Sequence, residues 1–446
     1  MNESIFVRSD LALLGGPRAV TTEPKDLFDW PIVTEEHEQA VLEALRARKM
    51  SGRDITQQFE AEYARAIGRT YALGCNNGTA AIHCGLYGMG VGVGDEVIVP
   101  SITYWASALP LYSLGATPVF ADVDPETLCI DPAEIERWVS PRTKAVVVVH
   151  YAGMPADMDA IMPIAEKHGL MVLEDASHAH GTLYKGKEAG TFGVAAAFSL
   201  MTGKSLAIGE AGILFTDDQR VYERALLFGH YARHRDIELP DLKARAGLPC
   251  GGYKYRMHQL SSAFGLVELG LYPQRVAEID RAMNRFCDLV ADVPGFRPVR
   301  PAADSGSTKG GWYFPRARYD PEAFGGLSVG RFAEAVVAEG SECHPGCNWP
   351  LHLHPVFSEV DVYGHGRPTR VAHLPQGETI SQPPGSLPVS ESVSQRVLGI
   401  PWFKHDRPDV IEQHAEAFRK VAASYKDLLP GDEPDRQVGG YSTART

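Results

Sequence analysis

The sequence contains no long apolar run, because no stretch reaches the ~18 consecutive apolar residues expected of a membrane span. Its opening, MNESIFVRSDLALLGG, lacks the basic, apolar and small-residue succession of a secretory signal. Excess positive charge is also missing, since 43 basic and 56 acidic residues give a net charge of −13. Phosphate backbones and anionic lipids attract basic surfaces. We therefore expect a cytoplasmic protein that binds neither nucleic acid nor membranes.

A disulfide framework and a complete metal site are missing as well. The 446 residues include seven cysteines, an odd number scattered along the chain, which fits a reducing compartment. Cys343, His344, Cys347, His352 and His354 gather in one segment, but no second C-x-x-C knuckle completes a four-ligand zinc site. We expect no metal here and interpret the histidines as packed or substrate-facing.

Two glycine-rich stretches resemble nucleotide-binding motifs but lack essential positions. The segment TGKS (202–205) ends like a phosphate-binding P-loop, yet Phe198 stands where its first glycine should be. The glycines of GMGVGVG (88–94) have the wrong spacing for a dinucleotide fingerprint, and they precede a predicted strand instead of following one. Nucleotide hydrolysis and dinucleotide binding are therefore disfavoured.

The chain does show a regular alternation of helix and strand patterns between residues 34 and 218. Nearly continuous Val/Ile runs between helices are typical of a mostly parallel sheet covered on both faces. After residue 250 the character changes to long helices (258–293) and a loop rich in Pro, Ser and Gly (371–392). The predicted strands are 95–100, 117–123, 144–150, 169–176, 195–200 and 212–217, and the predicted helices are 34–49, 78–90, 104–115 and 158–169.

These patterns predict an α/β fold with a large sheet domain and a smaller C-terminal α+β domain. The length suits such a pair of domains. We expect an N-terminal arm (1–30), a large domain (31–255), long helices with the smaller domain (256–430) and a disordered tail (431–446).

One predicted helix start and one predicted strand end carry residues suited to an anionic, aromatic ligand. Gly78 and Thr79 begin a helix, whose free N–H groups can bind a phosphate, although a plain helix cap is an equal alternative. Asp175 ends an apolar strand, where open α/β sheets bind ligands. A protonated pyridine nitrogen would satisfy its charge, and a structural salt bridge is the alternative.

Two further strand ends complete the set. Lys204 follows Ser199 by five residues in a Gly-rich turn, and a lysine in a partly desolvated pocket can attack a carbonyl carbon. Tyr104, after the strand 95–100, can stack on a flat ring. A surface lysine and an ordinary core aromatic are the alternatives. Together the four elements indicate a pyridoxal 5'-phosphate (PLP) enzyme.

Longer stretches then carry a family resemblance from about residue 10 to 425. They include NNGTAAIHCGL, GVGDEVIVPSITYWASA, HGLMVLEDASHAHG and FSLMTGKSLAIGEAGILFTDD. The chain resembles the fold-type-I PLP enzymes, and within them the DegT/StrS-type sugar aminotransferases. The resemblance implies that Lys204 binds the cofactor as a Schiff base and that Asp175 contacts the pyridine nitrogen. It also implies phosphate contacts by Gly78, Thr79 and Ser199, and ring stacking by Tyr104 in preference to Trp105.

Two positions depart from the commoner family pattern. His178 stands where many members have a glutamine that binds the phenolic oxygen of the cofactor. Lys254 stands where many have an asparagine that reaches the phosphate in the neighbouring subunit, which implies a homodimer with shared active sites. The opening LALLGGPRAV and the segment WPLHLHPVF (349–357) resemble glutamine:scyllo-inosose aminotransferases. We expect Tyr151 and His352 to contact substrate hydroxyl groups.

The expected activity is transfer of an amino group from glutamine or glutamate to a keto-cyclitol or keto-sugar, in aminoglycoside or other natural-product biosynthesis. The α-carboxylate of the donor needs a cation, and Arg256 and Arg233 are candidates. A sugar dehydratase or lyase of the same fold is one alternative. A non-enzymatic sensor or scaffold is the other, although such a protein would not need Lys204 and Asp175.

Overall fold

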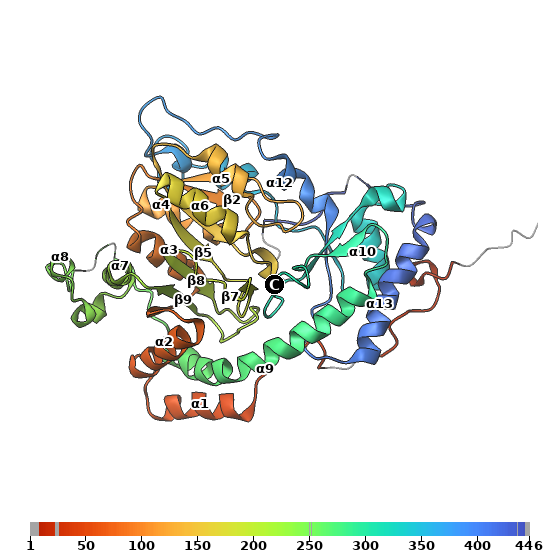
Figure 1. Ribbon diagram of the computed structural model, residues 1–446, viewed down its shortest axis with the longest axis horizontal. Coiled ribbons are helices and arrows are strands. Elements are labelled where there is room, and N and C mark those ends of the chain that lie inside the picture. The colour runs from red at the N-terminus through yellow and green to blue at the C-terminus, as the bar shows by residue number, and fades with distance from the viewer. Residues whose placement is uncertain (1–8, 23–25, 249, 251, 435, 442–446) are drawn as a thin grey trace, which may run out of the picture.

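Two sheets organise the computed structural model, which describes residues 9–22, 26–248, 250, 252–434 and 436–441 (Figure 1). A seven-stranded sheet forms the large domain and a four-stranded sheet the smaller one, with a hairpin of β6 (Leu183–Tyr184) and β7 (Lys187–Glu188) beside them. The large sheet contains β1 (Tyr71–Cys75), β2 (Glu96–Pro100), β3 (Thr117–Ala121), β4 (Thr143–Val149), β5 (Met171–Asp175), β8 (Ala195–Ser199) and β9 (Gly212–Thr216).

The strand directions place the ends of several strands at one edge of the large sheet. The order is β1-β9-β8-β5-β4-β2-β3, and the pairs from β8 to β3 are parallel. Strand β9 pairs antiparallel with both β1 and β8, so β1 runs in the same direction as the parallel strands. The mostly parallel sheet is therefore confirmed, and β1 adds a strand that the sequence pattern did not predict.

Side chains alternate between the two faces of this sheet, as a β-strand requires. In β8, Ala195 and Ala197 belong to the core between the sheet and α3–α7. Ala196 and Phe198 belong to the core on the opposite face, between the sheet and helices α2 and α9. Figure 1 shows α4–α6 above the sheet and α2 and α9 below it. The helices of this part are α1 (Glu35–Arg46), α2 (Asp54–Ile67), α3 (Gly78–Gly88), α4 (Pro110–Leu114), α5 (Pro132–Trp138), α6 (Met158–His168), α7 (Gln219–Gly229), α8 (Pro240–Lys243) and α9 (Gln259–Leu289).

Helix α9, with 31 residues, connects the large domain to the smaller one (Figure 1). The smaller core packs residues of α9 against its own sheet and helices, and it also takes in Leu11 and Leu27 from the N-terminal arm. The arm is thus built into the smaller domain. The elements here are β10 (Phe296–Pro298), β11 (Arg316–Tyr319), β12 (His344–Pro345), β13 (Val397–Gly399), α10 (Val329–Ala338), α11 (Pro355–Ser358), α12 (Pro388–Ser392) and α13 (Pro408–Ala423).

Part of the C-terminal tail, for which the sequence predicts disorder over residues 431–446, has defined partners in the structure. Residues 436–441, named here the C-terminal strap, run beside Asn348 in a parallel bridge through Gly440. The indole nitrogen of Trp349 donates to the Val438 carbonyl at 2.7 Å, and Val438 is buried. The polar composition of the tail predicts disorder. It says nothing of these partners, because they lie far away in the sequence. Residues 442–446 lie outside the described part of the chain.

The predicted domain boundaries at residues 30, 255 and 430 remain predictions. Leu351, Phe357 and Leu387 belong to the core of the large domain, although they lie inside the predicted range 256–430. The chain therefore returns to the large domain after β12. Within the described ranges, none of the helices combines the length and the apolar character that crossing a membrane requires.

Candidate active site

A cavity of about 350 Å³ opens at the edge where β1, β2, β5 and β8 end. Ligands of open α/β sheets bind at such strand ends. Tyr313, Phe314 and Asn348, from segments that flank the smaller sheet, complete the cavity. Seven residues predicted from the sequence line it: Gly78, Thr79, Tyr104, Asp175, His178, Ser199 and Lys204.

The start of α3 forms an anion-binding corner of the cavity. The side chain of Asn77 caps the helix by accepting from the backbone N–H of Ala80 at 2.8 Å, and Thr79 is exposed beside it. A Cβ at Gly78 would lie 2.7 Å from the Cβ of Ser199, so only glycine lets the helix start approach the end of β8 this closely. The free N–H groups of the first helical turn suit a phosphate.

Asp175 and its neighbour Glu174 point to opposite faces of β5, as successive strand residues do. Glu174 accepts hydrogen bonds from the backbone N–H groups of Gly190, Phe192 and Gly193, so its role is structural. Asp175 faces the cavity and is 5% exposed. Its carboxylate accepts from the hydroxyl of Ser107 at 2.6 Å, a neutral donor. Asp175 is thus a buried carboxylate available to a cationic ligand atom.

Lys204 lies in the turn between β8 and β9 and is 8% exposed. Its Nζ sits 4.0 Å from the centre of the Tyr313 ring, a cation–π distance. The indole nitrogen of Trp30 donates to the Lys204 carbonyl at 2.7 Å and fixes the turn from the N-terminal arm. The turn leads into a strand and not into a helix, so it differs from a P-loop in structure as well as in sequence.

His178 lines the cavity and retains a hydrogen-bond donor. Its Nδ1 accepts from the backbone N–H of Ala152 at 3.2 Å. Burial, and after it the positive charge of Lys204, lower the pKa of His178 well below its ordinary value, so the ring is neutral. A neutral imidazole that accepts at Nδ1 carries its proton on Nε2. The ring also packs 4.7 Å from that of Tyr313.

The structure distinguishes between the two aromatic residues that follow β2. Tyr104 lines the cavity and is 40% exposed, so its ring is free to cover a ligand. The ring of Trp105 instead packs edge-on against His354, 6.0 Å away. The geometry supports the choice of Tyr104 as the stacking residue.

The two residues expected to contact substrate hydroxyl groups are both buried outside the cavity lining. His352 is 1% exposed, and its ring nitrogens bond to Ser101 at 2.8 Å and to Glu391 at 3.0 Å. Tyr151 is fully buried and donates to the Oδ1 of Asn348 at 2.6 Å. The ring nitrogens of His352 are thus both occupied in this protomer, and Tyr151 stands one residue behind the surface that Asn348 provides. The substrate contacts expected for these two residues remain predictions.

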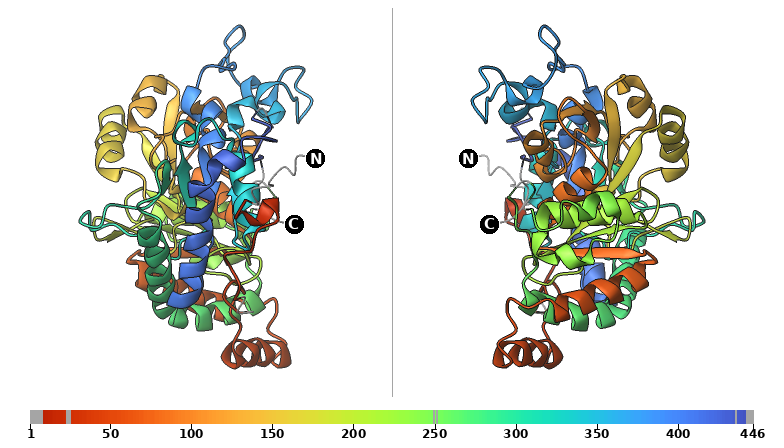
Figure 2. Two further views of the ribbon diagram at one scale, coloured as in Figure 1. Left: turned by 90° about the vertical axis from the view of Figure 1, so that its right-hand side faces the viewer. Right: turned by 90° about the vertical axis from the view of Figure 1, so that its left-hand side faces the viewer.

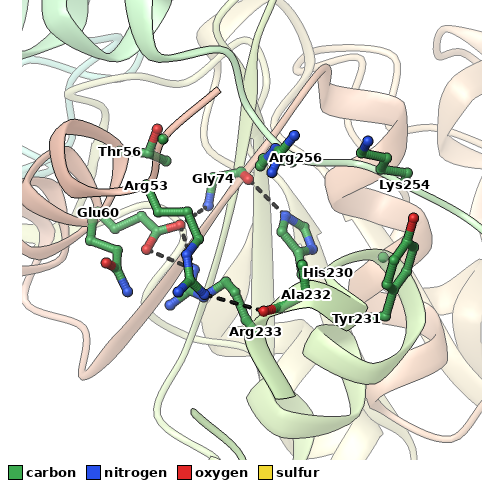
Figure 3. Close-up of a pocket in the computed structure, with 13 residues that line it drawn as sticks. Arg53, Thr56, Glu60, Gly74, His230, Tyr231, Ala232, Arg233, Lys254 and Arg256 are labelled. Atoms are coloured by element: carbon green, nitrogen blue, oxygen red, sulfur yellow. Dashed lines mark hydrogen bonds and ion pairs between the residues drawn. The ribbon is translucent and has the colours of Figure 1, made fainter. Parts of the chain in front are cut away.

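The remaining predicted cations lie in a second pocket of about 30 Å³, shown in Figure 3. Arg233 is neutralised there by Glu60, with two contacts of 3.0 Å, and by Asp236 at 2.8 Å. It is therefore not a free carboxylate-binding cation. Lys254 is exposed and Arg256 half-buried in the same pocket, away from the cavity of their own protomer.

Sequence reasoning missed the cavity residues that the smaller domain supplies. Tyr313 and Phe314 precede β11, and Asn348 follows β12. One signal was available: Asn348 immediately precedes the segment 349–357 that carried the finer resemblance. The described residues contain no group of three or more His, Cys, Asp or Glu side chains placed to hold an ion.

A lysine amine and a buried carboxylate at the strand ends of this sheet define the site of a fold-type-I PLP enzyme. A model of the DegT/DnrJ/EryC1/StrS aminotransferase family matches residues 31–396, and the chain belongs to that family. It is accordingly an aminotransferase, and its cofactor is pyridoxal 5'-phosphate.

Similar proteins cover nearly all of the chain. The spore coat polysaccharide biosynthesis protein SpsC of Bacillus subtilis is 33% identical over 88% of this chain and 96% of its own length. An L-glutamine:scyllo-inosose aminotransferase of Streptomyces griseus is 30% identical over 94% of this chain and 99% of its own. An aminotransferase structure from Psychrobacter cryohalolentis superimposes with a TM-score of 0.76 at 27% identity, over 90% of this chain and 100% of that one.

The residues present fit the cofactor. A helix start that only a glycine permits suits its phosphate, the buried Asp175 suits its pyridinium, and the half-exposed Tyr104 suits the face of its ring. The Nε2–H of His178 suits its phenolic oxygen. These features occupy the strand-end side of a single cavity, in which the amine of Lys204 also lies.

Proposed function

We propose that this protein transfers an amino group from glutamine or glutamate to a polyhydroxylated ketone, a keto-cyclitol or a keto-sugar, in the biosynthesis of an amino-modified natural product. The observation that carries the proposal is the convergence of the Lys204 amine and the Asp175 carboxylate in one cavity. The S. griseus relative, named for glutamine and scyllo-inosose, supports the choice of substrates.

The proposed roles follow from where each side chain lies. When bound, the cofactor supplies an electron sink that stabilises negative charge at the reacting carbon. Lys204 holds the cofactor covalently at rest and, once its amine is free, moves the proton at that carbon as a general base and acid. Asp175 accepts a hydrogen bond from the pyridinium N–H, and Gly78, Thr79 and Ser199 bind the phosphate.

The charge of the cavity favours an uncharged acceptor. Among the described lining residues, Lys204 is the only lysine or arginine, and we assign it to the cofactor. Glu210 adds a carboxylate to the lining of the same cavity. A diphosphate linked to a nucleotide would meet no free cation of this protomer there. A keto-cyclitol, which carries hydroxyl groups and no phosphate, avoids that cost.

A homodimer forms part of the proposal. Lys254 is exposed and lies away from the cavity of its own protomer, so we assign it to the cofactor phosphate of a second copy. Helix α1, which projects from the body in Figure 2, exposes Leu42 and Leu45 and provides apolar surface for such a contact. The molecular mass measured in solution tests whether the protein is a dimer. Variants in α1 test whether that mass falls to the monomer value when the contact is removed.

The main experiment follows the visible absorbance band of the lysine-bound cofactor in purified protein. We expect glutamine or glutamate to bleach the band, and scyllo-inosose, but not a nucleotide-linked keto-sugar, to restore it. Restoration only by the nucleotide-linked sugar would replace the acceptor class. A band insensitive to both donors would reject the donor assignment, and release of water or cleavage products in place of an amine would favour a dehydratase or lyase.

A further inference from the structure

Asn348, in the segment that follows β12, presents an amide to the cavity, and both ends of its side chain are already held. Its Oδ1 accepts from the hydroxyl of Tyr151 at 2.6 Å. Its Nδ2 donates to the backbone carbonyl of Tyr441, in the C-terminal strap, at 3.2 Å. The residue is 4% exposed and lines the cavity between these two partners.

The chemistry of the partners fixes which way this amide points. The Tyr151 oxygen receives the backbone N–H of Asn348 at 3.4 Å, and the guanidinium of Arg316, which can only donate, lies beside it. The single proton of the phenol is therefore directed to Oδ1. At the other end the Tyr441 carbonyl can only accept, so it requires the NH₂ group. A reversed amide would lose both hydrogen bonds.

Arg316 is held where it can serve this arrangement. It is 2% exposed, and its guanidinium carbon lies 3.4 Å from the centre of the Phe314 ring, which lines the cavity. The cation is thus enclosed between the Phe314 ring and the Tyr151 phenol, one layer behind the cavity surface. It begins a directed series of donors that runs through Tyr151 and Asn348 to the strap.

The strap is anchored independently of Tyr441. The backbone N–H of Trp349 donates to the Gly440 carbonyl at 3.0 Å, and the Trp349 indole donates to the Val438 carbonyl at 2.7 Å. A Cβ at Gly439 would lie 2.3 Å from the Cys347 carbonyl, so glycine allows the strap to approach this closely. The Tyr441 carbonyl is therefore in a fixed place relative to Asn348.

With its outer partners fixed, the amide has one N–H and one oxygen lone pair left, and Asn348 lines the cavity. We propose that Asn348 binds a hydroxyl group of the ketone acceptor, as donor and acceptor at once, and that Tyr151 and the C-terminal strap are its positioning residues. A hydroxyl group matches this pair because it both donates and accepts. A donor carboxylate matches it poorly because it only accepts, and the free lone pair would repel it.

This assignment rests on the proposed function and is tested by separating the two half-reactions. Asn348→Asp keeps the shape of the side chain but removes its N–H groups. We expect the KM for scyllo-inosose to rise about tenfold or more, as expected for a lost hydrogen-bonded contact. The rate at which glutamine bleaches the cofactor band is expected to stay within about twofold of wild type, because the donor does not use this amide.

Tyr151→Phe tests the positioning role, since it keeps the ring and frees the amide to rotate. We expect a smaller, several-fold rise in the same KM, and no further rise when it is combined with Asn348→Asp. Additive effects would show that Tyr151 does not act through Asn348. Slower bleaching by glutamine in Asn348→Asp would overturn the acceptor assignment, although the aminotransferase function would stand.

The strap is tested in the full-length chain by Gly439→Val, which pushes the strap from Cys347. Gly431→Val is the matched control, because Gly431 also has a positive φ but its added Cβ would meet nothing closer than 3.6 Å. We expect only Gly439→Val to raise the KM for scyllo-inosose, with cofactor content and glutamine bleaching unchanged in both. Equal KM values in the two folded variants would reject the role of the strap. A wild-type protein that glutamine bleaches but scyllo-inosose does not restore would instead defeat the proposed acceptor.

Discussion

The cavity has two walls that are built in different ways. The strand-end wall (Gly78, Thr79, Asp175, His178, Ser199 and Lys204) follows the ends of β1, β5 and β8 in one sheet. The small-domain wall (Tyr313, Phe314 and Asn348) comes from connecting segments, and Phe314 has a positive φ of 56°. The first wall repeats one local pattern, a polar residue after an apolar strand. The second depends on partners distant in the sequence.

The difference suggests a division of labour, in which the strand-end wall holds the cofactor and performs proton transfer while the small-domain wall selects the substrate. Changes in the first wall are expected to affect both half-reactions. In the second wall, changes at Asn348 are expected to affect the acceptor alone. The following predictions concern the strand-end wall and its supports, from the largest expected effect to the smallest.

Lys204→Ala gives the largest expected effect. Removal of a general acid–base group costs ~10²–10⁴-fold in rate, and the covalent link to the cofactor is lost too. We expect no lysine-bound absorbance band and no measurable bleaching by glutamine. Lys243→Ala, at an exposed lysine of α8, is the control and should behave as wild type. Full turnover by Lys204→Ala would refute the scheme.

Gly78→Ala should weaken cofactor binding, because its Cβ would lie 2.7 Å from the Cβ of Ser199 and shift the start of α3. Loss of a hydrogen bond to a charged group costs ~1.5–3 kcal/mol, so we expect a roughly 10- to 100-fold higher dissociation constant for the cofactor. Gly92→Ala, with nothing within 4 Å of the new atom, should leave binding unchanged. Equal affinities in the two variants would argue against a phosphate site at Gly78.

The buried ring of His180 should make stability fall in mild acid. Burial lowers its pKa to about 3, while its Nε2 bonds to the Ser199 carbonyl at 2.8 Å. In the unfolded chain this histidine has a pKa of ~6.5 and takes up a proton as the pH falls below it, whereas in the native protein it stays neutral. The group therefore lowers the free energy of unfolding by about 2 kcal/mol between pH 6.5 and 5. His180→Gln lacks this titration. The stability deficit of His180→Gln in urea should therefore narrow at pH 5, and a constant deficit would contradict the assignment.

His178→Phe removes the Nε2–H donor and should weaken cofactor binding about fivefold, since a neutral hydrogen bond contributes ~1 kcal/mol. His178→Gln can donate again and should recover most of the loss. An absorbance titration with the cofactor gives its dissociation constant for both variants. If the glutamine and phenylalanine variants bind alike, His178 acts through packing alone.

Trp30→Phe gives the smallest expected effect, because it removes one hydrogen bond to the Lys204 carbonyl and keeps most of the ring. We expect a several-fold lower rate of bleaching by glutamine, from a turn that is less firmly held, with ~1 kcal/mol lost. Trp138→Phe loses a comparable bond to Glu134 far from the cavity and serves as control. Equal rates in both variants would show that the arm does not position Lys204.

The sequence by itself determined the strand-end wall. Apolar strands and the residues that directly follow them are local features, and parallel strands necessarily bring their ends to one edge. The positions of Lys204, Asp175 and Gly78, and the mostly parallel sheet, could therefore be predicted. Resemblance to a family added the expected cofactor contacts of His178 and Lys254.

Only the tertiary structure decided the small-domain wall. Nothing local indicates that Tyr151 is buried behind Asn348, that His352 is held between Ser101 and Glu391, or that the polar tail docks beside Trp349. Each of these facts depends on hydrogen bonds between residues separated by tens to hundreds of positions. Such contacts form only in the folded chain, because the free energy that selects them comes from burial and pairing in the folded state.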